Sequence, residues 1–194
     1  MDTKQKILHN AQISFSKFGY AATSIRKLAR ESGIRESGIY NHFSSKSEIF
    51  NTILKRIKIN IIDKDIFTDE LLDKLNNPFD FLTTATKRLI QKWTKKQNTL
   101  DLKFLILAQN DDPETDKISL NEIIENSKKI WVLIFSEIMK FNLIKKNQPE
   151  EVATQFFEPL FLCRLKFLSE DYSETKFIAD VNRHLKIFWQ SIKL

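Results

Sequence analysis

Residues 24–43 read SIRKLARESGIRESGIYNHF, and the prediction of the fold starts from these twenty residues. It predicts two short helices on either side of Gly33, because glycine permits the sharp turn between them. Ala29 is small enough to let the second helix lie close across the first, and Ile34 and Ile39 are expected to lock the pair onto a preceding helix. Two helices joined in this way are typical of a helix-turn-helix, which presents one face of its second helix to the DNA major groove.

Local signals around this stretch predict the neighbouring elements. A regularly spaced apolar stripe predicts a helix over residues 3–18, and Gly19 is the residue type that most easily ends one. Thr23 or Ser24 is a natural N-cap for the second helix, and the third is expected over residues 36–43. The N-terminal part is therefore expected to be a unit of three helices.

A capping box marks the next helix start. The Ser45 hydroxyl can accept a hydrogen bond from the Glu48 N–H while the Glu48 side chain reaches back, and the helix should continue to about residue 62. Prolines mark several later starts, since proline is favoured at the first helical position. The further helices are expected near 65–75, 78–96, 99–109, 113–143, 149–169 and 173–194.

The composition indicates an all-α protein. Only three glycines and four prolines occur in 194 residues, whereas sheets and hairpins need turn residues roughly every 8–12 positions. The single cysteine, Cys163, excludes an internal disulfide framework and multi-cysteine metal sites. The start of the chain lacks an apolar signal core, and no apolar run approaches the roughly 18 residues of a membrane span. We therefore expect a soluble cytoplasmic protein with no membrane partner, no metal and no cofactor.

The positive charge is concentrated in the N-terminal third. Residues 1–62 hold 11 Lys and Arg against 4 Asp and Glu, a net charge of +7. The remaining residues hold 20 bases and 21 acids, a net charge of −1. A local basic field attracts phosphate polyanions, which makes nucleic acid the first partner to consider. The alternative interpretation is an ordinary solvated basic surface.

Residues 4–54 resemble the N-terminal DNA-binding domain of the TetR (tetracycline-repressor-like) family of bacterial transcriptional regulators. The residues that carry the resemblance are Ile7, Ala11, Phe15, Gly19, Tyr20, Thr23, Ser24, Ile25, Leu28, Ala29, Gly33, Ile34, Ile39, Tyr40, His42, Phe43, Ser45, Lys46, Glu48, Ile49 and Phe50. The resemblance implies a three-helix helix-turn-helix DNA-binding domain over residues 1–48. It further implies a helical bundle domain for ligand binding and dimerisation over residues 49–194.

The resemblance also implies a function. TetR-like proteins are cytoplasmic homodimers that bind a palindromic double-stranded DNA operator, usually as repressors that a small-molecule effector releases. The last two helices, near 149–169 and 173–194, would pair across the two-fold axis of the dimer. The helices within 78–143 would enclose the effector pocket.

The DNA contacts are carried over residue by residue. Tyr40 and His42 match positions that usually meet phosphates and base edges, and Asn41 between them is suited to reading adenine. Lys46 matches a lysine that touches a backbone phosphate, and Thr23 and Arg26 match phosphate-clamping positions. The complete predicted interface is Thr23, Ser24, Arg26, Arg35, Glu36, Ser37, Gly38, Tyr40, Asn41, His42 and Lys46.

Two departures from the family pattern lie at the start of the third helix. Arg35 stands where Ser or Thr usually caps this helix, and Ser37 stands where glycine is usual. Gly38 lies inside the helix, which costs about 1 kcal/mol relative to alanine. We therefore expect that Gly38 allows a closer approach to DNA and that Arg35 and Ser37 contact bases.

Other interpretations of the chain stay open. Trp93, Phe104, Trp131 and Phe135 are candidates to line an effector pocket, with ordinary core packing as the alternative. Aromatic residues without an obvious buried acid favour an apolar effector. Two rival functions are an effector-independent architectural or cell-division DNA-binding protein on the same scaffold, and a helical protein-interaction module. No catalytic constellation or phosphate-binding glycine loop is present in the sequence, so no enzyme is expected.

Overall fold

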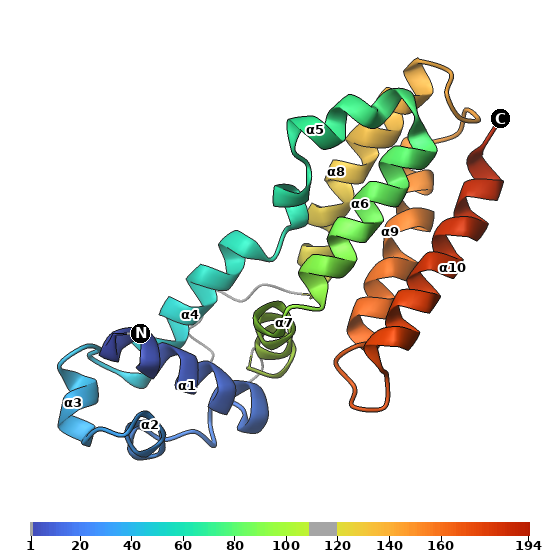
Figure 1. Ribbon diagram of the computed structural model, residues 1–194. Helices are drawn as coiled ribbons and strands as arrows, with labels where there is room; N and C mark the ends of the chain where they lie inside the picture. Colours follow the sequence, from blue (N-terminus) through green and yellow to red (C-terminus); the bar gives the residue numbers. More distant parts are fainter. Residues whose placement is uncertain (1, 109–119) are drawn as a thin grey trace. The chain divides into compact units, whose positions relative to one another are not determined.

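The computed structural model describes residues 2–108 and 120–194, and every regular element within these ranges is helical (Figure 1). The prediction of an all-α fold is confirmed. Within the same ranges, no helix combines the length and the apolar character that crossing a membrane requires.

The chain packs as two compact units. Unit 1 comprises the described residues up to Ile61 and the segment that begins at Lys96, whereas unit 2 comprises Ile62–Lys95 and Asn121–Leu194. The predicted boundary after residue 48 separates a DNA-binding domain from a domain for ligand binding and dimerisation, and it stays a prediction. The boundary in packing falls later in the chain, and it assigns a segment from the middle of the sequence to the N-terminal unit.

The helices of unit 1 are α1 (Thr3–Phe18), α2 (Ile25–Ser32), α3 (Glu36–Tyr40), α4 (Lys46–Asn60) and α7 (Lys96–Ala108). Unit 2 holds the short 3-10 helices η1 (Asp63–Ile66) and η2 (Asp73–Asn76) and the α-helices α5 (Asp69–Leu72), α6 (Pro78–Trp93), α8 (Leu120–Lys140), α9 (Pro149–Lys166) and α10 (Glu174–Ile192). Leu120, the first residue of α8, is assigned to unit 1.

Most predicted helices are present with ends shifted by a few residues. The helix expected over 36–43 already ends at Tyr40. The single helix expected near 65–75 is wrong, because η1, α5 and η2 replace it. Here the Thr68 hydroxyl accepts a hydrogen bond from the Leu71 N–H and starts a new helix. The predictions for 99–109 and 113–143 fall partly on residues 109–119, outside the described residues.

α1 is the centre of unit 1 and packs against α2, α4 and α7. Ile7, Ala11 and Phe15 from the predicted apolar stripe are fully buried. The Phe15 ring centroid lies 5.5 Å from that of Phe50 on α4 and 6.2 Å from that of Phe104 on α7. The structure therefore corrects one prediction: Phe104 belongs to this core around α1 and not to an effector pocket in the helical bundle.

A buried polar network ties the same helices together. The Gln12 side chain is fully buried, and its amide donates to an Asp101 carboxylate oxygen at 2.6 Å. The Gln12 amide oxygen accepts hydrogen bonds from Arg56 and, at 3.0 Å, from Gln97. Both ends of a buried amide are thus satisfied, which makes the network specific for one arrangement of α1, α4 and α7.

α6, α8, α9 and α10 run alongside one another in unit 2 (Figure 1). The Trp131 ring lies 4.5 Å from Phe156, and Phe156 lies 5.0 Å from Phe188, measured between centroids. Phe135 joins the same cluster, and its side chain, like that of Trp131, is buried. Trp131 and Phe135, two of the candidates for an effector pocket, therefore pack in the core of unit 2. This agrees with the alternative interpretation, ordinary core packing.

A buried carboxylate lies beside the third candidate of unit 2, Trp93. Asp63 is 3% exposed and accepts a hydrogen bond from the Trp93 indole N–H at 3.0 Å. The Lys92 ammonium lies 3.2 Å and the Arg164 guanidinium 3.6 Å from its oxygens. A buried acid that was not obvious from the sequence therefore lies beside this aromatic candidate. Because two cations neutralise Asp63, this acid does not by itself argue for a cationic effector.

Candidate DNA-binding interface

Caps fix both ends of α2. The Ser24 hydroxyl accepts from the Lys27 N–H at 3.2 Å, which identifies Ser24 and not Thr23 as the N-cap. Gly33 follows the helix in the left-handed conformation, with φ 68°, where any side chain would be strained. Its N–H donates to Arg30 and that of Ile34 to the Ala29 carbonyl, at 3.1 and 3.0 Å. The predicted glycine-jointed turn is confirmed.

The next helix offers its predicted contact residues to solvent. Ile39 and Phe43 are buried, whereas Tyr40 is 56% exposed and Asn41 and His42 are exposed. Because α3 ends at Tyr40, Asn41 and His42 lie in the turn that follows it, held by a bond from the His42 N–H to the Ile39 carbonyl. Within unit 1 these three side chains form an open surface next to α3.

The start of α3 lacks a side-chain cap, as the sequence suggested. Arg35 occupies the N-cap position and makes no capping hydrogen bond, and Arg35, Glu36 and Ser37 are exposed. A Cβ placed on Gly38 would lie 3.4 Å from the Ile34 side chain, so this position faces the turn between α2 and α3. That distance is an ordinary van der Waals contact, and the closer approach to DNA at Gly38 stays a prediction.

Thr23 is a second correction. Its side chain is fully buried, its hydroxyl donates to the Gly19 carbonyl at 2.9 Å, and its N–H donates to the Tyr20 carbonyl. Both donors therefore hold the loop between α1 and α2, and Thr23 cannot clamp a phosphate in this conformation. The neighbouring predicted residues Ser24 and Arg26 are exposed.

Lys46 has a structural contact that sequence reasoning missed. Its ammonium group donates to the Tyr20 carbonyl at 2.9 Å and lies 4.0 Å from the centroid of the Tyr20 ring. This contact fastens the start of α4 to the loop after α1. The contact with a DNA phosphate stays a prediction, and the amphipathic Tyr20 was the only signal that could have suggested the second role.

The capping box at the start of α4 is shared by two serines. The Ser45 hydroxyl accepts from the Glu48 N–H at 3.0 Å, as predicted. The Glu48 carboxylate reaches back to Ser44, accepting from its hydroxyl at 2.7 Å and from its N–H. These hydrogen bonds hold the pKa of Glu48 below its ordinary value, and the charge of Lys4 adds a smaller contribution. A charged carboxylate at this helix start stabilises the loop that follows α3.

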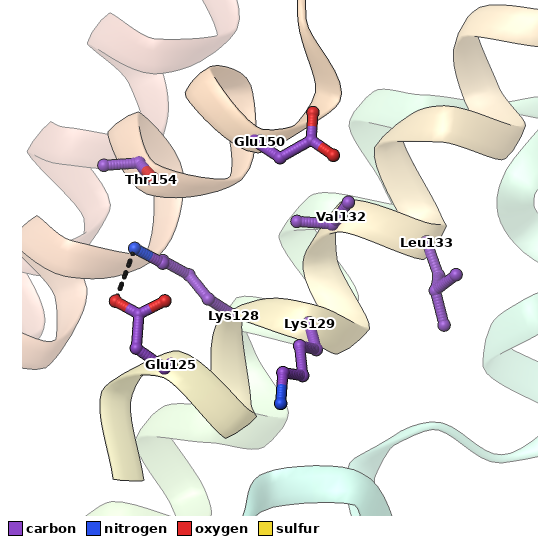
Figure 2. A pocket seen from close by; sticks show the side chains of 7 residues that line it. All are labelled: Glu125, Lys128, Lys129, Val132, Leu133, Glu150 and Thr154. Carbon is purple, nitrogen blue, oxygen red and sulfur yellow. Dashed lines mark ion pairs between the residues drawn. The ribbon is translucent and has the colours of Figure 1, made fainter. Parts of the chain in front are cut away.

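Unit 2 carries a surface groove between α8 and α9 (Figure 2). Its volume is about 400 Å³, within the range of small-molecule sites. Val132 and Leu133 line it with apolar surface, and the Lys128 ammonium forms an ion pair with Glu125 at 2.9 Å (Figure 2). Glu150 lines it from the first turn of α9. None of the four aromatic candidates lines this groove.

In the described residues, no group of three or more His, Cys, Asp or Glu side chains is placed to hold a metal ion. The exposed surface around α2 and α3 is instead rich in donors and cations. Such a surface suits hydrogen bonding to phosphates and base edges.

Residues 7–53 match the family model described as "Bacterial regulatory proteins, tetR family". The N-terminal part of this chain therefore matches the TetR family. The match coincides with α1 to α4 apart from their outermost turns, and so with the capped turn, the open α3 surface and the start of α4. The TetR resemblance predicted from residues 4–54 is confirmed.

Curated relatives match the N-terminal part of this chain as well. The IcaR protein of Staphylococcus aureus, the negative transcriptional regulator of the biofilm operon icaADBC, is 29% identical over 104 residues. That match covers 50% of this chain and 54% of IcaR, so the chain spans about half the length of this relative. The uncharacterised HTH-type transcriptional regulator YhgD of Bacillus subtilis is 39% identical over 62 residues, covering 30% of this chain and 32% of YhgD.

Solved structures share the TetR fold over the whole chain. A TetR-family transcriptional regulator of Mesorhizobium loti superposes with a TM-score of 0.65 at 17% identity, covering 99% of this chain and 97% of its own. SmeT, the repressor of the Stenotrophomonas maltophilia multidrug efflux pump SmeDEF, gives 0.62 at 14% identity, covering 100% and 92%. At this identity the likeness concerns the fold.

Proposed function

We propose that this chain is a transcriptional repressor that binds a palindromic operator as a homodimer and leaves it when a small-molecule effector binds. The observation that carries the proposal is the open surface of Tyr40, Asn41 and His42 beside a capped helix-turn-helix. The net charge of +7 over residues 1–62 supports duplex DNA as the partner of that surface. A repressor of this kind works in the cytoplasm, where the bacterial chromosome lies.

The direction of regulation is proposed from the relatives. IcaR is named a negative regulator and SmeT a repressor, and the family match covers the DNA-binding helices of this chain. Bound at a promoter, a dimer of this kind would block transcription of the adjacent genes. Two recognition helices related by a two-fold axis would enter successive major grooves, about 34–36 Å apart.

The proposed dimer uses α9 and α10. Leu162 on α9 and Ile187 on α10 leave 51% and 64% of their surface exposed, although both helices also bury large apolar side chains on another face. A helix that is apolar on two faces packs both on its own unit and on a partner. This supports the pairing predicted for the segments near 149–169 and 173–194.

The effector is proposed to bind unit 2. The groove between α8 and α9 has a suitable volume and an apolar wall of Val132 and Leu133, which supports the proposal of a largely apolar ligand. Trp93, Trp131 and Phe135 are closed into the core, so a ligand that meets them must first open that core. Mass spectrometry of small molecules that copurify with the protein tests this part of the proposal.

Fluorescence anisotropy tests the DNA-binding part. The wild-type protein is titrated against a labelled duplex from the promoter region of its own operon and against an unrelated duplex of equal length. We expect tighter binding to the promoter duplex, two chains per site and affinity that falls steeply with salt. Binding without release by any small molecule would favour the architectural alternative. Absence of salt-sensitive DNA binding would favour the protein-interaction module.

A further inference from the structure

The first turns of α1 carry two lysines where a helix does not favour them. Lys4 and Lys6 are exposed, and the first turn of α1 contains no acidic residue. Cations are unfavourable at a helix N-terminus, because the peptide dipoles already place positive charge there. Asp2 at the N-cap of α1 and Glu48, whose carboxylate interacts electrostatically with Lys4, are acidic groups nearby. Both lysines nevertheless stay exposed to solvent, so their ammonium groups can meet a partner.

Both ammonium groups lie next to the recognition unit. The Lys4 ammonium is 5.3 Å from the centroid of the Phe43 ring, and Phe43 directly follows the exposed His42. The Lys6 ammonium is 3.6 Å from where a Cβ on Gly33 would lie, at the turn that leads into α3. The two charges thus bracket α3, one beside the turn before it and one beside the loop after it.

We infer that Lys4 and Lys6 contact DNA backbone phosphates on either side of the recognition helix, so that the DNA interface extends onto α1. The inference rests on the proposed function. Lysine ammonium groups contact phosphate as point charges and carry no base information, so the contacts position α3 without reading sequence. Each lysine that neutralises a phosphate releases a condensed counterion, which gives the contact a thermodynamic signature of its own.

The test compares the double variant Lys4→Gln/Lys6→Gln with wild type in DNA titrations over a range of salt concentrations. Each lost phosphate contact makes the slope of log K against log salt shallower by about 0.9, so the double variant should differ by about 2. At about 0.1 M salt its affinity should fall on the order of 10- to 100-fold. The loss should be equal for operator and unrelated duplexes, because phosphates are the same in both.

Three controls separate this role from a structural one. Lys55→Gln removes an exposed charge from α4 of the same unit and should leave the slope unchanged. Lys4→Arg/Lys6→Arg keeps both charges and should restore the slope. The midpoint of thermal unfolding of the glutamine variant should stay close to that of wild type, because both side chains are exposed.

Three outcomes count against the inference, and they differ. If the glutamine variant binds with wild-type slope while Arg26→Ala weakens binding, the α1 contacts are refuted and the proposed function stands. If the wild-type protein binds no duplex at any salt concentration, the proposed function fails and takes the inference with it. A glutamine variant that loses binding only together with its thermal stability also refutes the inference, since the lysines would then be structural.

Discussion

The recognition surface of unit 1 and the Asp63 ion cluster of unit 2 hold their polar groups in opposite places. In unit 1 the residues proposed for function, such as Tyr40 and His42, are exposed, and short-range caps hold the helices that present them. In unit 2 the distinctive group is the Asp63 carboxylate, which is buried between residues distant in sequence. Substitutions in the first surface should therefore change binding at constant stability, whereas substitutions in the second cluster should change stability first.

The largest effect is expected for Asp63→Ala. This substitution leaves the Arg164 side chain, which is 4% exposed, without the carboxylate 3.6 Å away, and it removes the acceptor of the Trp93 indole. Breaking a buried ion pair by removing one partner costs about 3–5 kcal/mol. We expect a loss of this size in the free energy of unfolding, measured by urea denaturation.

Asp65→Ala is the matched control. Asp65 also pairs with Lys92, but its side chain is 66% exposed, so its loss should cost at most about 1 kcal/mol. If the two variants lost equal stability, burial would not set the cost of losing a carboxylate in this cluster, and the contrast between buried and exposed polar groups would fail.

The recognition surface and the buried Asp63 ion cluster also differ in how much of each could be predicted from the sequence. The capped turn at Gly33 and the capping box at Ser45 are local, so residue types a few positions apart predicted them. The ion cluster of Asp63 with Arg164 depends on which helices meet, and no spacing along the chain encodes that. The same limit explains Phe104, whose aromatic type was clear but whose place in the core around α1 was not.

Errors within the candidate site have equally specific causes. Thr23 matched a contact position by residue type, yet the loop between α1 and α2 uses both of its donors. That Gly38 faces the Ile34 side chain could not be predicted, because the sequence does not give the direction in which this position points. The end of α3 at Tyr40 moved Asn41 and His42 from a helix into a turn. Exposure of the three residues was nevertheless predicted, because Ile39 and Phe43 already supply the buried face.

A second prediction addresses the exposed side of the comparison. Tyr40→Ala removes a 56% exposed ring, so the free energy of unfolding should change by no more than about 0.5 kcal/mol. Operator binding should weaken by about 1–3 kcal/mol if the ring or its hydroxyl contacts DNA. Anisotropy titration and urea denaturation of the same preparation measure the two quantities.

Tyr40→Phe sharpens that result, because it keeps the ring and removes only the hydroxyl. Binding that is lost in both variants assigns the contact to the hydroxyl, whereas binding lost only in Tyr40→Ala assigns it to the ring. Unchanged affinity in both variants would show that the exposed surface is not the DNA interface.

A third prediction tests how much the left-handed conformation of Gly33, between α2 and α3, contributes to stability. Gly33→Ala places a side chain at φ 68°, a conformation that costs an L-residue about 1–2 kcal/mol. The added Cβ meets only the Lys6 ammonium at 3.6 Å, so strain and not collision is the main cost. Urea denaturation should show this loss of stability. Gly33→Asn should cost less than Gly33→Ala, because asparagine tolerates the left-handed region better, and the reverse order would contradict a conformational origin.

The smallest effect concerns pH and returns to the buried interior of unit 2. The His184 Nε2 lies 3.0 Å from the Phe156 carbonyl oxygen, to which it must donate its hydrogen. Burial lowers the pKa of His184, and this hydrogen bond raises it by a smaller amount. With a folded pKa below the unfolded value of about 6.5, the unfolded chain binds more protons in the window between them. Stability is therefore complete above about pH 6.5 and declines as the pH falls through that window.

His184→Gln isolates this contribution, because a glutamine amide can still donate to the Phe156 carbonyl and does not titrate. The free energy of unfolding is measured at about pH 7.5 and about pH 5.5, which bracket the pKa of histidine in the unfolded chain. Between these two pH values it should fall less in this variant than in wild type. An equal decline in both proteins would mean that the burial of His184 has no effect on the pH dependence of stability.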